Sequence, residues 1–251
     1  MTTNTVKDAA RLIYFGLNVQ ELPSTQTEYA DLYDRYIRDA EFAAQVRAVG
    51  AGLHLDVVDA GYHSGLVLVP RERNTLFAVS LTDYRKSLAR LSGAANTPRR
   101  AVLALMQIAV ALTFFPTTQD LAALREARPE ADARAVAATL LELAQAAEQA
   151  ASRDKPLPAT LRLAWQDVLS LPVTQESSNR PSVNSLTGMA ELTLRHLAEQ
   201  GLMRPSELGT ADFPVYFASQ RYQSLLQKAG LPEAFSAAAH LLGRELESLD
   251  V

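Results

Sequence analysis

The sequence predicts a mainly α-helical protein with small β-hairpin wings, arranged as tandem winged-helix domains. Twice along the chain, a helical pattern runs into two short apolar segments joined by a polar turn. A helix followed by a small antiparallel hairpin is how a winged-helix domain ends. In addition, 48% of the residues are hydrophobic, which supplies two cores of about 100 residues each. The paired apolar segments are 53–58 with 64–70, and 201–205 with 213–219.

The first predicted domain spans 1–115. Apolar residues at helical spacing predict its helices, and Gly50 and Gly52 end the second helix in a way that suits a left-handed C-terminal residue. Thr97 and Pro98 start the last helix well, because a hydroxyl caps it and proline loses no hydrogen bond in the first turn. The predicted helices are 6–17, 28–49, 76–92 and 98–115.

A helical connector is predicted at 116–158, followed by a second domain at 159–251. Pro129 separates two alanine-rich stretches of the connector, since proline ends a helix. Pro156 and Pro158 stiffen the chain, and we place the domain boundary there. The predicted helices of the connector are 118–128 and 130–152, and those of the second domain are 159–171, 186–200, 219–230 and 233–249.

Composition limits the classes of function. The net charge of −4 argues against a protein that coats nucleic acid nonspecifically. The chain has no cysteine, which excludes disulfides, thiolate catalysis and thiolate metal sites. The N-terminus lacks the pattern of a signal peptide, and the longest apolar run, 101–115, is shorter than the roughly 20 residues of a membrane span. We therefore expect a cytoplasmic protein that makes no membrane contact.

No residue pattern indicates an enzyme. The sequence contains no GxxxxGK[ST], GxGxxG or GxSxG motif. It therefore shows neither a glycine-rich phosphate-binding loop nor the nucleophile elbow of a serine hydrolase. The spacings of His54, His63, His196 and His240 match no zinc site. The carboxylates are scattered, whereas acid–base catalysis needs two of them held across a cleft. We expect no catalytic residue, no metal and no cofactor.

Positive charge gathers in one stretch, 70–104. It holds seven basic and two acidic residues, a local charge of +5 in a chain of net −4. Arginine suits phosphate oxygens, so this stretch is a candidate contact for the DNA backbone. Contact with an acidic partner subunit and a merely solvated surface remain alternatives. The DNA-backbone candidates, with one residue from the polar connector 173–185, are Arg71, Arg73, Arg85, Lys86, Arg99, Arg100 and Arg180.

A row of tyrosines follows one side of the predicted helix 28–49. Tyr29, Tyr33 and Tyr36 recur at helical spacing, for which core packing is the default interpretation. Tyrosine is also favoured at interfaces, so the row is our candidate for a dimer or partner surface.

The whole layout resembles the KITE family, the kleisin-interacting tandem winged-helix subunits of bacterial condensin-like complexes. It is most similar to the accessory subunits of the Muk, Mks and Wadjet types. The match is one of pattern and covers nearly the whole chain. The residues that carry it are AARLIYFG (9–16), the first wing at 52–70, the helix at 98–116, and the second helix and wing at 192–226.

The resemblance implies a partner set. A KITE subunit forms a homodimer through its N-terminal domains, binds a kleisin and, through the kleisin, joins an SMC ATPase. It hydrolyses nothing itself, and it contributes a surface that faces double-stranded DNA. Such a chain is nucleoid-associated, and its complex organises chromosomes or restricts plasmids.

Two other classes of function are compatible with the sequence. One is a stand-alone winged-helix transcription regulator, whose recognition helix enters the major groove of DNA. The best candidate helix, 186–200, offers mainly Glu191, Arg195 and Glu199, a poor set for reading bases. The other class is a scaffold protein that does not touch DNA.

Overall fold

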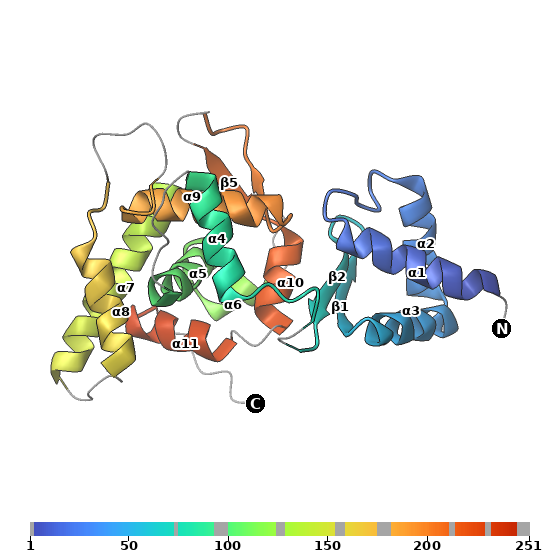
Figure 1. The fold of residues 1–251 in the computed structure, drawn as a ribbon, viewed down its shortest axis with the longest axis horizontal. Coiled ribbons are helices and arrows are strands. Elements are labelled where there is room, and N and C mark those ends of the chain that lie inside the picture. Colours follow the sequence, from blue (N-terminus) through green and yellow to red (C-terminus); the bar gives the residue numbers. More distant parts are fainter. Residues whose placement is uncertain are drawn as a thin grey trace. The chain divides into compact units, whose positions relative to one another are not determined.

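The computed structural model is mainly helical, with small antiparallel sheets, as predicted (Figure 1). It divides into two compact units. Unit 1 comprises Met1–Ser80, Gln200–Leu202 and Ser219–Ala229, and unit 2 comprises Leu81–Glu199, Met203–Ala218 and Gly230–Val251. The structure describes residues 3–72, 75–92, 100–123, 129–153, 159–174, 182–210, 214–228 and 232–244.

Unit 1 consists of four helices and one hairpin among its described residues. Its elements are α1 (Thr3–Leu17), α2 (Thr27–Arg38), α3 (Ala40–Gly52), β1 (Leu55–Gly61), β2 (Gly65–Pro70) and α10 (Gln220–Lys228). The prediction of a single helix at 28–49 is wrong, because Asp39 adopts an extended conformation between α2 and α3. Its carboxylate accepts hydrogen bonds from the backbone N–H groups of Glu41 and Phe42, which caps α3.

The hairpin of unit 1 is antiparallel and carries a β-bulge. The register pairs Val57 with Leu68 and then Asp59 with Val67, so Val58 lies opposite no residue of β2. Gly65 begins β2 with a φ of 68°, and a Cβ there would collide with Tyr29 Oη. Only glycine adopts this positive φ without strain and has no Cβ to collide with the tyrosine.

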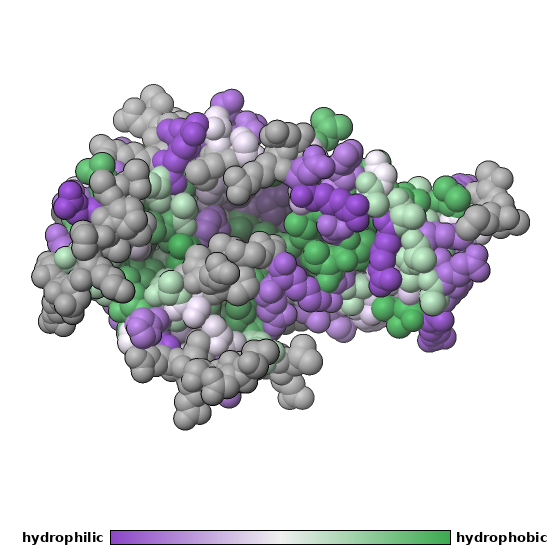
Figure 2. All heavy atoms as spheres, turned by 90° about the horizontal axis from the view of Figure 1, so that it is seen from below, coloured by the Kyte–Doolittle hydropathy of each residue, from purple (hydrophilic) through white to green (hydrophobic). Residues whose placement is uncertain are grey.

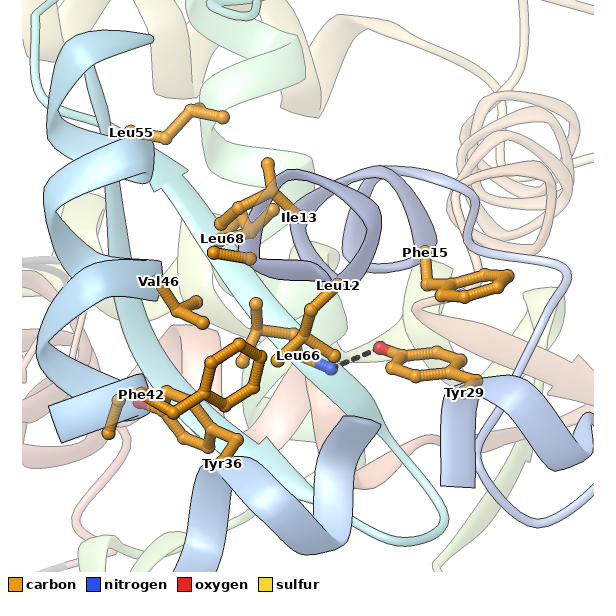
Figure 3. Packing of buried hydrophobic residues seen from close by; sticks show 12 residues of the cluster. Leu12, Ile13, Phe15, Tyr29, Tyr36, Phe42, Val46, Leu55, Leu66 and Leu68 are labelled. Atoms are coloured by element: carbon orange, nitrogen blue, oxygen red, sulfur yellow. Dashed lines mark hydrogen bonds between the residues drawn. The ribbon is translucent and has the colours of Figure 1, made fainter. Parts of the chain in front are cut away.

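The core of unit 1 lies between its helices and the hairpin (Figure 3). The Tyr29 ring stacks on Phe15 at 4.9 Å between ring centroids, and its hydroxyl accepts a 2.6 Å hydrogen bond from Leu66 N. Burial of each large side chain contributes about 1.5–3 kcal/mol to stability. The other labelled residues of this core are Leu12, Ile13, Tyr36, Phe42, Val46, Leu55 and Leu68.

Unit 2 is larger and contains a three-stranded antiparallel sheet. Its strands lie in the order β3–β5–β4, so the strand from the middle of the chain pairs with the far strand of the second hairpin. The strand β3 differs from the prediction, which was a helix over 130–152. The elements are α4 (Leu81–Ser92), α5 (Arg100–Phe114), α6 (Thr118–Ala122), β3 (Glu130–Asp132), α7 (Ala133–Arg153), α8 (Ala159–Ser170), α9 (Leu186–Glu199), β4 (Met203–Pro205), β5 (Val215–Ala218) and α11 (Pro232–Leu241).

The residue boundaries of the two units do not coincide with the predicted ranges 1–115, 116–158 and 159–251. The helices α4 and α5 pack with α7 and α9, which places them in unit 2. Conversely, α10 packs on β1 and β2, so a segment from late in the sequence belongs to unit 1. The predicted helix 76–92 starts only at Leu81, and Leu76 and Val79 before it are exposed.

No described helix combines the length and the apolar composition that a membrane crossing requires.

Candidate nucleic-acid and partner interfaces

Arg71, the first basic candidate, lies at the end of the hairpin in unit 1. Its Nε donates a 2.7 Å hydrogen bond to Asp56 Oδ1 of β1, and both side chains are about half exposed. Its backbone N–H donates to His54 O, which extends the hairpin by one hydrogen bond. The Arg71 charge is therefore partly balanced by Asp56.

Three further candidates lie on α4 and at the start of α5, in unit 2. Arg100 Nη2 donates a 2.9 Å hydrogen bond to Thr82 Oγ1, which brings the first residue of α5 to the first turn of α4. Lys86 follows Thr82 by one helical turn and Arg90 follows by two, so they share one side of α4. Arg100, Lys86 and Arg90 are exposed, whereas Arg85 is half-buried. We call these three exposed cations the α4 basic strip.

One acidic residue partly offsets the positive charge of this strip. Asp83 Oδ1 lies 3.7 Å from Lys86 Nζ, and both side chains are more than half exposed, so the pair is weak and screened by salt. The structure thus distributes the described basic candidates over two units, with Arg71 in unit 1 and Arg85, Lys86 and Arg100 in unit 2. The candidates Arg73, Arg99 and Arg180 lie outside the described residues.

The tyrosine row lies mostly inside unit 1. Tyr29 is fully buried and Tyr36 is 8% exposed, so both side chains belong to the hydrophobic core. Burial raises the pKa of Tyr29. Tyr33 is half-buried, and its ring contacts that of Tyr62 at 6.1 Å. Tyr33 is therefore the member of the row with the largest solvent-facing part.

A different apolar stripe of unit 1 faces solvent, along α1. The side chains of Val6, Tyr14 and Leu17 are 53%, 55% and 38% exposed, and Ala10 lies between them on the same side of the helix. We call these residues the α1 stripe. The sequence run LIYF at 12–15 could have predicted this stripe. Four consecutive apolar residues point to every side of a helix, and a single core covers only some of them. Figure 2 shows other apolar side chains interspersed with hydrophilic ones on one face of the molecule.

The helices that precede the two hairpins differ in their surroundings. In α3 only four of 13 residues are buried, and the outward side exposes Ala40, Glu41, Ala44, Arg47 and Ala48. In α9 eight of 14 residues are buried, because α4, α5, α7 and β4 all pack against it (Figure 1).

A polar cluster joins α4 to α9. Tyr84 Oη donates to Thr193 Oγ1 at 3.2 Å and accepts from Gln107 Nε2 at 2.6 Å. The Tyr84 ring also contacts the imidazole of His196 at 4.9 Å between centroids. Burial raises the pKa of Tyr84 to about 12 and lowers the pKa of His196. The cluster therefore consists of neutral groups at neutral pH.

This cluster lacks the geometry of a nucleophilic relay. Ser87 Oγ lies 3.4 Å and Glu199 Oε2 lies 3.9 Å from the same atom, His196 Nδ1. A serine–histidine–acid relay needs the serine and the acid on opposite ring nitrogens. Within the described residues, no group of three or more His, Asp or Glu side chains is placed to hold a metal ion.

A scan against protein-family models finds no match for this chain, and searches of curated proteins and of solved structures also find none.

Proposed function

We propose that this protein is a non-catalytic accessory subunit of a bacterial SMC complex, similar to the KITE subunits. In this proposal the chain is a tandem winged-helix protein that forms a homodimer, binds a kleisin and, with its SMC ATPase, acts at the nucleoid. The sheet order β3–β5–β4 is the observation that carries the proposal. One strand between two helices, paired with the last strand of a hairpin that follows another helix, is the strand pattern of a winged-helix domain.

Unit 1 supports the same assignment in a simpler form. Three helices precede an antiparallel hairpin, and all of them contribute to one core with β2. Both units therefore place a helix directly before a hairpin. A tandem of such units is what the resemblance to KITE proteins requires.

The surroundings of α3 and α9 disfavour the transcription regulator. A recognition helix must offer side chains to base edges in the major groove. On α9 only Arg195 and Glu199 are exposed, and α4 packs against this helix. The outward side of α3 presents three alanines, with Glu41 and Arg47 as its base-reading types. Neither helix offers a base-reading set, so we favour contact with the phosphate backbone.

The α4 basic strip is our candidate for that backbone contact. In the assembled complex, the triple variant Lys86→Glu, Arg90→Glu, Arg100→Glu is expected to lower DNA affinity at least about tenfold and to flatten its salt dependence. Arg162→Glu on α8 is the matched control, because Arg162 is exposed and lies outside the strip. Unchanged affinity in the triple variant would remove DNA contact from this surface.

The α1 stripe is our candidate for the homodimer surface, in place of the buried tyrosines. Tyr14→Glu with Leu17→Glu is expected to convert a dimer into a monomer, measured by light scattering after size exclusion. Leu163→Glu is the control, because Leu163 is an exposed leucine of unit 2. A dimer that withstands the α1 double variant would show that it forms through another surface.

Purification of the tagged protein from its native host tests the proposal as a whole. Co-elution of a large coiled-coil ATPase and a kleisin-like chain, identified by mass, is the expected result. A lone homodimer that retains one specific DNA site would overturn it in favour of the transcription regulator.

A further inference from the structure

Two tyrosines of unit 1 meet at its surface, one from a helix and one from the hairpin turn. Tyr33 lies on α2 and Tyr62 lies in the turn between β1 and β2, and their ring centroids are 6.1 Å apart at an interplanar angle of 58°. Tyr62 is 46% exposed, and Tyr33 is half-buried. Because the rings are tilted rather than stacked, neither covers the face of the other, and aromatic surface remains available to another group.

One side of α2 extends this aromatic surface. Ala30 and Ile37 lie three residues before and four residues after Tyr33, so these residues share one side of the helix. Ile37 is 56% exposed, and Ala30 is half-buried. We call Ala30, Tyr33, Ile37 and Tyr62 the α2 patch.

Two carboxylates act on the α2 patch through their charge. Asp34 follows Tyr33 on α2, and Asp59 lies on β1. Burial and these two carboxylates raise the pKa of Tyr33. Asp59 is already neutralised by Lys228 at 3.1 Å, whereas Asp34 lies 3.4 Å from Arg38 in a pair whose side chains are both more than half exposed. Such a pair is weak, so Asp34 is the carboxylate with more charge left for another cation.

Arginines already lie over other aromatic rings of unit 1. The Arg35 guanidinium lies 4.2 Å from the ring centroid of Phe42, and that of Arg47 lies 5.9 Å from the ring centroid of Tyr36. Among the described residues, no arginine or lysine lies in this way over a ring of the α2 patch. The patch therefore combines open aromatic surface and a carboxylate without the cation that the other rings have.

We propose that the α2 patch binds a segment of a partner protein that carries an arginine or lysine beside an apolar side chain. In this arrangement the cation lies over the tyrosine rings, whose faces are negative, and close to the Asp34 carboxylate. The apolar side chain covers Ile37 and removes its exposed surface from water. The phosphates of nucleic acids and lipids are disfavoured, because both carboxylates repel them. This proposal does not depend on the proposed function.

Selection of peptides on the full chain tests the proposal. A library of random dodecapeptides displayed on phage is selected on the natural chain and, in parallel, on the Tyr62→Ser chain. Peptides that bind only the natural chain are expected to carry arginine or lysine beside an apolar residue. Tyr14→Ser is the matched control, because Tyr14 is an exposed tyrosine outside the patch. If no peptide depends on Tyr62, or if the dependent peptides lack a basic residue, the proposal is overturned.

A synthetic peptide from this selection tests the role of charge. Its affinity, measured by fluorescence polarisation, is expected to fall about threefold in Asp34→Asn and to weaken as salt is added. Asp31→Asn is the matched control, because Asp31 is exposed and lies two residues before Tyr33, a spacing that points to another side of the helix. Equal affinities of the two variants would overturn the cationic ligand.

The oligomeric state separates a partner protein from a second copy of the chain. Light scattering after size exclusion is expected to give the same mass for the natural and the Tyr62→Ser chains. A lower mass for Tyr62→Ser would overturn the proposal in favour of a second copy. If circular dichroism shows that Tyr62→Ser loses helix, Asp34→Asn replaces it in the selection and in the mass measurement, since it alters only an exposed charge.

Discussion

Both units contain a helix followed by a hairpin, but different parts of this pattern are covered by other elements in the two units. In unit 2 the helix is enclosed, since α4 packs on α9 through Tyr84. In unit 1 the helix α3 keeps an open side, and it is the hairpin that α10 covers. The same local pattern thus occurs in both units, but the surface that each unit leaves exposed depends on which later or earlier helix packs against it.

The largest expected difference between the two helices concerns stability. Leu192 of α9 is fully buried, and Leu192→Ala is expected to lower the free energy of unfolding of unit 2 by about 2–5 kcal/mol. Trp165, the single tryptophan, lies in unit 2 and is buried, so its fluorescence in urea reports this unit. A loss below about 1 kcal/mol would mean that α9 is not enclosed.

Removal of the Tyr84 hydroxyl is expected to have the next largest effect. Tyr84→Phe leaves Gln107 and Thr193 without their shared partner, which costs about 1–3 kcal/mol. Exchange in α4 should become faster than in α7. Tyr14→Phe is the control, because the Tyr14 side chain is exposed. Equal behaviour of the two variants would contradict the role of the polar cluster in covering α9.

Acidification should loosen the packing of α4 on α9 and that of α10 on the hairpin at different pH values. Burial lowers the pKa of His196 from its ordinary 6.5, so the stability from the neutral imidazole is full above 6.5 and is lost as pH falls through the folded pKa. Ser87, Tyr84 and Glu199 face this ring. Hydrogen exchange should therefore show α4 loosening below about pH 6.5, and His196→Gln should abolish this dependence.

The packing of α10 on the hairpin of unit 1 should respond only at lower pH. At Asp59, desolvation opposes ionisation, but the hydrogen bonds of Ser224 and Lys228 outweigh it and lower the pKa below 3.8. The stability from this carboxylate is present above 3.8 and is lost as pH falls through the folded pKa. Between pH 6 and 4, α4 should thus exchange faster while α10 does not. If α4 and α10 loosen at the same pH, the packing of the two helices is coupled.

The smallest effect is expected on the open side of α3. Ala44 is exposed, and Ala44→Gln should change the free energy of unfolding by about 0.5 kcal/mol or less. The same variant placed in the assembled complex reports whether a partner uses this surface, since lost binding without lost stability identifies an interface.

Much of the secondary structure follows from the sequence because its causes are local. The alternation of apolar residues and Gly65 specify the first hairpin, and helical spacing specifies α1, α5 and α9. The break at Asp39 escaped prediction although capping is also local, because the apolar spacing of the tyrosines continues across it. The strand β3 escaped as well, since three residues become a strand only when β5 supplies their hydrogen bonds.

By itself, the sequence determined a mainly helical chain with two hairpins and a basic stretch between them. Only the tertiary structure decided which residues reach solvent. Tyr29 and Tyr36 of α2 lie in the core, whereas Tyr14 and Leu17 are exposed because α2, α3 and β2 pack on the other sides of α1. It also decided that α4 covers α9 and that α10 joins unit 1. Contacts between residues more than 100 positions apart depend on packing, which no local pattern encodes.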